Sequence, residues 1–154
     1  MKAIAILMTL ALYLVGGAAW SAESPMMGTW KLDEAKSKLS PGAGKNTAVV
    51  YAAAGDSVKI TVDGVDRDGK PAHNEWTGKF DGKDYPVTGD PTTDARSYEK
   101  ADEHTLKFTA KKGGKVTLTG TIVVSADGRT RTVTTTGTDS RGEKVNITSV
   151  YDKQ

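Results

Sequence analysis

Aromatic residues near the middle of the chain have the types and spacing that a binding pocket for a small apolar molecule needs. Trp76 and Phe80 share one face of a predicted strand, and Gly78 between them leaves space where a side chain would otherwise stand. Phe108 lies on a similar segment further along. These rings can fill a core, and they can equally line a ligand cavity, because such cavities are mostly apolar with a few placed polar groups. We take Trp76, Phe80 and Phe108 as candidate ligand-binding residues.

Arg96 and Tyr98 can supply the polar contacts of such a pocket. The two residues are two positions apart, so they share one face of a predicted strand. If that face points inward, Arg96 can receive a carboxylate and Tyr98 can hydrogen-bond to it. A buried arginine needs an acidic partner, which the protein or a ligand must provide. If the face points outward, both side chains are solvated, and the sequence leaves the two orientations open.

Signals for metal binding and catalysis are weak. His73 and His104 are the two histidines and cysteine is absent, so the sequence offers few of the cysteine and histidine ligands that zinc usually takes. The spacing of Asp63, Asp66 and Asp68 does not follow the calcium-loop pattern. The sequence has no Gly-x-Ser-x-Gly elbow and no paired carboxylates in an apolar setting. We therefore expect no metal, no cofactor and no enzymatic activity.

Composition narrows the class of protein. A length of 154 residues fits one domain. The 21 basic and 19 acidic residues give a net charge of +2, which is too small to indicate a nucleic-acid-binding surface. The absence of cysteine excludes disulfides and thiolate nucleophiles. Threonine is abundant, with 20 residues, 12 of them after position 100. This abundance favours strands.

Short antiparallel strands are the elements that would position the candidate residues. Apolar and polar residues alternate repeatedly, as at Val58, Ile60 and Val62, which is typical of strands with one wet face. Asp-Gly pairs between these segments are strong hairpin signals. The predicted strands cover residues 27–32, 46–54, 57–65, 71–81, 84–88, 95–101, 104–111, 115–125, 130–138 and 144–152.

This spacing of strands predicts an all-β fold, a single antiparallel up-and-down β-barrel of about 8–10 strands. One short helix is expected after the first strand, over residues 33–39. Asp33 can cap this helix, and the Ser-Pro-Gly sequence at 40–42 would end it.

The first residues have the pattern of a secretory signal peptide. Lys2 gives a positive start, residues 4–15 form an apolar run, and residues 16–19 are small, as signal peptidase requires. The run is shorter than the ~20 apolar residues of a membrane-spanning helix. We therefore expect residues 1–22 to be removed and residues 23–154 to form one secreted or periplasmic domain with no membrane span.

Motifs at both ends of the predicted barrel point to a family. Residues 28–32 read Gly-Thr-Trp-Lys-Leu, and residues 148–153 read Thr-Ser-Val-Tyr-Asp-Lys. The first motif resembles the Gly-x-Trp strand of the lipocalin and fatty-acid-binding-protein (calycin) superfamily, and the second resembles the last strand of its intracellular lipid-binding members. The runs 28–38 and 79–91 resemble small exported bacterial proteins described as lipocalin-like.

The resemblance implies a lipocalin-like barrel with a ligand in its interior. It makes Trp30 a structural plug rather than a ligand contact, and it makes Tyr151 on the last strand a candidate ligand contact. Two features depart from the lipid-binding members. Ser149 stands where they carry the arginine that holds a ligand carboxylate, and the predicted helical segment is too short for their two-helix lid. The anion site of that branch is therefore not carried over.

We predict from these observations an exported lipocalin-like barrel that binds a small apolar or amphiphilic ligand in its interior. The alternative is a protein-binding barrel, such as a protease inhibitor or an envelope interaction module, whose partner would be another exported protein. The two differ in their interior, since a carrier needs accessible space and a protein-binding barrel can have a packed core.

Overall fold

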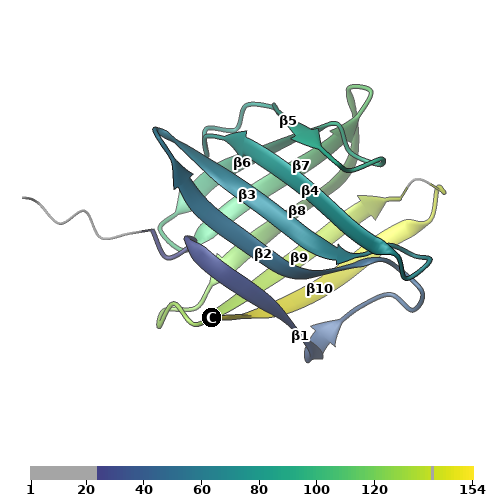
Figure 1. The fold of residues 1–154 in the computed structure, drawn as a ribbon, viewed down its shortest axis with the longest axis horizontal. Helices are drawn as coiled ribbons and strands as arrows, with labels where there is room; N and C mark the ends of the chain where they lie inside the picture. The colour runs from purple at the N-terminus through teal and green to yellow at the C-terminus, as the bar shows by residue number, and fades with distance from the viewer. Residues whose placement is uncertain (1–23, 140) are drawn as a thin grey trace, which may run out of the picture.

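The computed structural model describes residues 24–139 and 141–154. The predicted signal peptide, residues 1–22, lies outside these described residues. The described chain forms ten β-strands and no helix (Figure 1). Their bounds are β1 Gly28–Lys38, β2 Lys45–Ala54, β3 Ser57–Val65, β4 Pro71–Gly78, β5 Tyr85–Thr88, β6 Ala95–Asp102, β7 Thr105–Lys112, β8 Lys115–Val124, β9 Thr130–Thr138 and β10 Lys144–Lys153.

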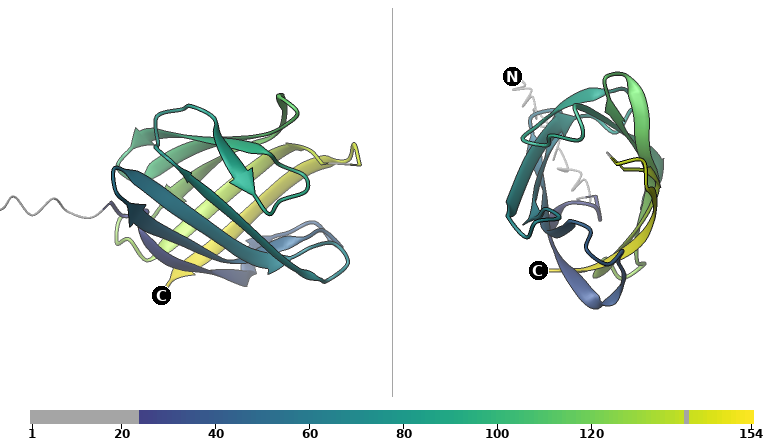
Figure 2. Two further views of the ribbon diagram at one scale, coloured as in Figure 1. Left: turned by 45° about the horizontal axis from the view of Figure 1, so that its top comes forward. Right: turned by 90° about the vertical axis from the view of Figure 1, so that its right-hand side faces the viewer.

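The ten strands form a closed barrel. Each strand pairs antiparallel with its neighbours along the chain, and β1 pairs with β10 to close the sheet. The right-hand view of Figure 2 shows the strands as a ring around the barrel axis. Closure removes the unpaired edges that an open meander would expose. The predicted all-β, up-and-down barrel is therefore confirmed, with ten strands.

The predicted helix over residues 33–39 is wrong, because β1 continues through this segment. The register of β1 against β10 shifts after Asp33 through a β-bulge. Within the bulge, the amide of Lys36 donates a hydrogen bond to Asp33 Oδ1 at 3.2 Å, and the hydroxyl of Ser37 donates to the Asp33 carbonyl at 2.6 Å. A helix cap would make similar local bonds. Pairing with β10 outweighs this local preference, since the amide of Val150 donates to Ser37 Oγ at 2.9 Å.

Two glycines let neighbouring strands bend where the barrel curves. A Cβ atom at Gly120 in β8 would collide with the carbonyl oxygen of Thr134 and with the ring of Phe108. Gly137 in β9 has a φ of 150°, and its Cβ would collide with the carbonyl oxygen of Thr117. A side chain at either position would force the two strands apart, and glycine kinks of this kind help sheets to close into barrels.

The end of the barrel where β1 begins and β10 finishes is filled with side chains; we call it the closed end. Trp30 is fully buried there, and its indole nitrogen donates a hydrogen bond to the Met26 carbonyl at 3.0 Å. This packing agrees with the structural role expected for Trp30. The largest of the described side chains that are less than 2% exposed, at this end and further along the interior, are Trp30, Trp76, Arg131, Met26, Ile60, Leu106 and Val124.

The opposite end, which we call the mouth, carries the β1–β2, β3–β4, β5–β6, β7–β8 and β9–β10 loops. Side chains alternate across a strand, so Arg131, Val133 and Thr135 all face inward from β9. Arg131 is buried, whereas Val133 and Thr135 are half-buried and the outward Thr134 is exposed. Leu118 in β8 is inward-facing and half-buried as well. On β8 and β9, the burial of inward residues therefore falls from the closed end toward the mouth.

Candidate functional site

Four of the six predicted ligand-binding residues form one aromatic cluster inside the barrel. Trp76 in β4 lies edge-on to Tyr98 in β6, with 4.8 Å between ring centroids. Phe80 stacks on Trp76 at 6.3 Å, and Phe108 in β7 lies 6.2 Å from Tyr98. Trp76 and Tyr98 are buried, while Phe80 and Phe108 are partly buried against the core. We call Trp76, Phe80, Tyr98 and Phe108 the aromatic floor.

Arg96, a fifth predicted residue, points into the barrel beside this floor. Only 13% of its side chain is exposed. Its Nη1 donates a long hydrogen bond of 3.4 Å to the hydroxyl of Tyr98, and its Nη2 lies 3.8 Å from a carboxylate oxygen of Asp90. The orientation that the sequence left open is therefore inward. Burial lowers the pKa of the guanidinium, but Tyr98 and Asp90 outweigh burial and raise it, so the group is cationic at neutral pH.

Local hydrogen bonds hold the groups around Arg96. The indole nitrogen of Trp76 donates to the Arg96 carbonyl at 2.8 Å, which fixes β4 against β6 across the short β5. Asp90, in the β5–β6 loop, accepts from both the amide and the hydroxyl of Thr92 at 2.8 Å. The side-chain oxygen of Asn74 is buried and has no hydrogen-bond partner among the described residues. The inner wall near the mouth thus has both a free acceptor and an incompletely paired cation.

Tyr151, the sixth predicted residue, belongs to a separate cluster at the closed end. Its ring lies under the guanidinium of Arg131, 4.5 Å from the centroid, and its hydroxyl donates to the Asn46 carbonyl at 3.2 Å. Burial raises the pKa of Tyr151, and the charge of Arg131 opposes this rise. The structure does not bring Tyr151 to the aromatic floor.

Sequence reasoning missed Arg131. Its guanidinium also lies 5.3 Å from the ring centroid of Trp30 and 5.1 Å from that of Tyr51. The Nε and Nη1 atoms are buried with no hydrogen-bond partner in the part of the chain that the structure describes. The sequence did carry one sign of this burial. Arg131 is two positions from Val133, so both side chains lie on the same, apolar face of β9.

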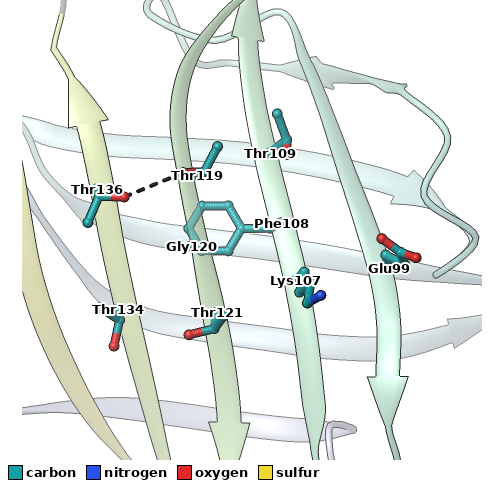
Figure 3. Close-up of a pocket in the computed structure, with 9 residues that line it drawn as sticks. All are labelled: Glu99, Lys107, Phe108, Thr109, Thr119, Gly120, Thr121, Thr134 and Thr136. Atoms are coloured by element: carbon teal, nitrogen blue, oxygen red, sulfur yellow. Dashed lines mark hydrogen bonds between the residues drawn. The ribbon is translucent and has the colours of Figure 1, made fainter.

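A pocket of about 430 Å³ lies on the outer face of the barrel, over β6 to β9. Figure 3 shows threonine side chains on β7, β8 and β9, with a 3.4 Å hydrogen bond between the hydroxyls of Thr119 and Thr136. These side chains alternate with inward residues such as Leu106 and Ala110, which are buried. We call this pocket the outer groove. Its lining residues are Glu99, Lys107, Phe108, Thr109, Thr119, Gly120, Thr121, Thr134 and Thr136. Of these, Phe108 and Gly120 stand at inward positions of β7 and β8, and the ring of Phe108 lies against Gly120.

A second, smaller pocket of about 70 Å³ lies at the mouth. Arg67 of the β3–β4 loop forms an ion pair there with Asp139, and a second one at 3.6 Å with Glu143, both from the β9–β10 loop. The exposed Arg141 pairs with Glu143 at 3.3 Å. These loops belong to strands that are not neighbours in the sheet, so the ion pairs link separated parts of the rim.

His73 and the aspartate residues weighed for metal binding lie on the outside, whereas His104 is half-buried and its Nδ1 has no hydrogen-bond partner among the described residues. Nδ1 of His73 is 2.6 Å from a carboxylate oxygen of Asp63, and Nε2 is 3.5 Å from Glu75. The pKa of His73 is raised, chiefly by the hydrogen bond with Asp63. Asp66 accepts hydrogen bonds from the amides of Asp68 and Lys70 at 2.9 Å, as in a loop that closes on itself. Among residues 24–139 and 141–154, no group of three or more histidine or acidic side chains is placed to hold a metal ion.

No protein-family model matches the chain. No curated protein matches it at a significant level either. No helix in the described part of the chain is long and apolar enough to cross a membrane.

Several solved structures match most of this chain at low sequence identity. The structure of EF1p2_mFAP2b bound to DFHBI matches with a TM-score of 0.49 and 12% identity, over 84% of this chain and 94% of that one. A redesigned beta barrel, mFAP1, bound to DFHBI, matches with a TM-score of 0.43 and 16% identity, over 84% and 95%. The redesigned beta barrel b11L5F_LGL matches with a TM-score of 0.45 and 14% identity, over 85% and 93%. These matches are likenesses of barrel architecture.

Proposed function

We propose that the protein is an exported, non-enzymatic barrel that binds a small apolar or amphiphilic ligand in the mouth half of its interior. The observation that carries the proposal is the inward-facing Arg96, a cation whose side chain is 13% exposed and makes one long hydrogen bond among the described residues. A buried charge of this kind is costly unless a partner completes it. A ligand that enters through the mouth is the partner that this arrangement fits.

The surrounding surface suits the apolar part of such a ligand. Leu118, Val133 and Ile147 face inward and are only half-buried, and the aromatic floor lies below them. Burial of apolar ligand surface contributes roughly 25 cal/mol per Å². Covering these side chains would therefore supply affinity, while Arg96 would set orientation.

A pair of adjacent substitutions tests whether binding is internal. The probe is N-phenyl-1-naphthylamine, a neutral dye that fluoresces strongly in apolar surroundings. Thr135→Trp places a bulky ring inside the mouth, whereas Thr134→Trp places the same ring in the outer groove. We expect a saturable fluorescence increase with wild type, a loss of about tenfold in affinity for Thr135→Trp because it occupies ligand space, and no comparable loss for Thr134→Trp.

Two results would contradict the proposal. The first is an absence of saturable dye binding by the wild-type protein. The second is a loss of binding in Thr134→Trp that Thr135→Trp does not share, since the dye would then occupy the outer groove. Circular dichroism of both variants shows whether each retains the barrel. Export is tested separately by the mass of the mature protein in periplasm and medium.

A protein-binding barrel is a second candidate, and the surface of β8 favours it. Val123 and Val116 are 44% and 50% exposed, and they are the large apolar residues that the described chain leaves on its surface. Val123 faces outward on the strand that lines the outer groove. If a protein partner docks here, immobilised wild type will retain it and Val123→Lys will not. Equal retention by both would count against this candidate.

A further inference from the structure

We infer that the interior ligand is an amphiphile with an anionic head group, and that Arg96 and Tyr98 together bind this head group. The inference rests on the proposed function, because it names the chemical class of the ligand for the same interior site. It is carried by the geometry around Arg96, by the charges inside the barrel and by the unused donor of Tyr98.

Arg96 has donors to spare. Within the described residues its side chain makes one hydrogen bond, the 3.4 Å contact with Tyr98. Asp90 lies at 3.8 Å, beyond hydrogen-bond distance, and its other oxygen is engaged by the amide and hydroxyl of Thr92. Asp90 is therefore held by its own loop, and it leaves the guanidinium edge free to pair with a second acid.

The interior carries more positive than negative charge. Arg131 is buried at the closed end and lies within 4 Å of no carboxylate in residues 24–139 and 141–154; three aromatic rings surround it instead. Among the described residues, Asp90 is the one acidic side chain within 4 Å of Arg96. Charge complementarity inside a low-dielectric space discriminates strongly between ligands. Two arginines facing the same interior therefore favour an anion and disfavour a cation.

Tyr98 adds a second donor at the right place. Its hydroxyl oxygen accepts from Arg96, so its own proton remains available for a ligand. A carboxylate or sulfonate can accept from the guanidinium and from this hydroxyl at once, and charge-assisted hydrogen bonds of this kind are the strong ones. The ring of Tyr98 belongs to the aromatic floor, so the apolar part of the ligand would lie against the floor while its head group meets Arg96.

Two dyes that differ by one sulfonate test the inference. N-phenyl-1-naphthylamine is neutral, and 8-anilinonaphthalene-1-sulfonate is the same ring system with an anionic group. Their affinities are measured by fluorescence titration for wild type, Arg96→Met and Tyr98→Phe. Arg129→Met serves as the matched control, because it removes the same charge from an exposed loop at the closed end.

We expect Arg96→Met to weaken binding of the sulfonate dye by about tenfold or more, and Tyr98→Phe to weaken it by about threefold or more. Binding of the neutral dye should change by less than about twofold in both variants, and Arg129→Met should resemble wild type. Tyr98→Phe keeps the ring and the core packing, so it tests the head-group contact even if Arg96→Met fails to fold.

The outcomes separate the two proposals. If the neutral dye binds internally and neither substitution changes the affinity for the sulfonate dye, the inference of an anionic head group is wrong. The proposal of an interior carrier then still stands. If the substitutions weaken binding of both dyes equally, Arg96 and Tyr98 shape the cavity but do not bind the anionic group, and the inference is again wrong. If neither dye binds wild type, the interior carrier fails and the inference fails with it.

Discussion

At the scale of single residues, Arg131 is a buried cation stabilised by aromatic rings rather than by an acid. Each desolvated cation–π contact contributes up to ~2 kcal/mol, and three rings lie 4.5, 5.1 and 5.3 Å from its guanidinium carbon. Against this, each of the two unpartnered nitrogen atoms costs about 1–3 kcal/mol. The two contributions nearly offset each other, so the stem of Arg131 stabilises the closed end mainly by filling space.

This balance predicts different results for two substitutions of Arg131. Arg131→Met keeps most of the side-chain volume. It removes the guanidinium that contacts the three rings, and with it the unpaired N–H donors, so we expect the free energy of unfolding to change by less than about 1.5 kcal/mol. Arg131→Ala leaves a cavity among Trp30, Tyr51 and Tyr151, and we expect a loss of about 3 kcal/mol or more. Urea unfolding followed by tryptophan fluorescence measures both. A loss above about 3 kcal/mol for Arg131→Met would show that the cation itself stabilises the barrel.

At the scale of strands, Gly120 and its neighbours explain how the β7–β8–β9 wall bends. The ring of Phe108 covers Gly120 from the inside, and the Thr134 carbonyl approaches it from β9. We expect Gly120→Ala to lower the free energy of unfolding by at least about 2 kcal/mol, since the added methyl must displace backbone and ring together. Gly42→Ala is the control: its φ is 71° but nothing lies within 4 Å of the added atom, so about 1 kcal/mol is expected. Equal losses in a thermal or urea titration would mean that close approach at Gly120 is unimportant.

The strands were largely predictable from the sequence, and the reason is their alternation. Val58, Ile60 and Val62 read as one apolar face, and β3 has the bounds that this pattern predicts, 57–65. The segment after Asp33 misled prediction because its local hydrogen bonds resemble a helix cap, while the pairing that makes it a strand comes from β10, more than a hundred residues away. Long-range pairing of this kind leaves no mark on the local sequence.

The candidate site was predictable in part for the same reason. Spacing placed Arg96 and Tyr98 on one face, but only barrel closure determines that this face is the inner one. Arg131 was missed because charge normally argues for exposure, and its aromatic partners come from β1, β2 and β10. Phe80 lies just beyond β4, where the end of a strand is hard to predict.

At the scale of the whole molecule, closure between β1 and β10 brings the described ends of the chain together. Trp30 pairs with Lys153, and the amide of Gln154 donates to the Thr29 carbonyl at 3.0 Å. Every strand therefore has two paired neighbours, including the first and the last. The barrel should then tolerate new chain ends wherever a hairpin turn is exposed. The turn at Gly113 and Gly114 is such a place: both glycines have positive φ and open space around them.

We therefore expect a circular permutant that starts at Gly114 and ends at Gly113, with a short Gly-Ser linker from Gln154 to Ser24, to fold into the same barrel. Its far-ultraviolet circular dichroism should match wild type, because every strand keeps both neighbours. A matched permutant opened between Gly120 and Thr121 cuts the middle of β8 and breaks its pairing with β7 and β9, so it should lose the cooperative unfolding transition. A folded second permutant, or an unfolded first one, would show that the β7–β8 hairpin and its connection matter more than closure of the ring.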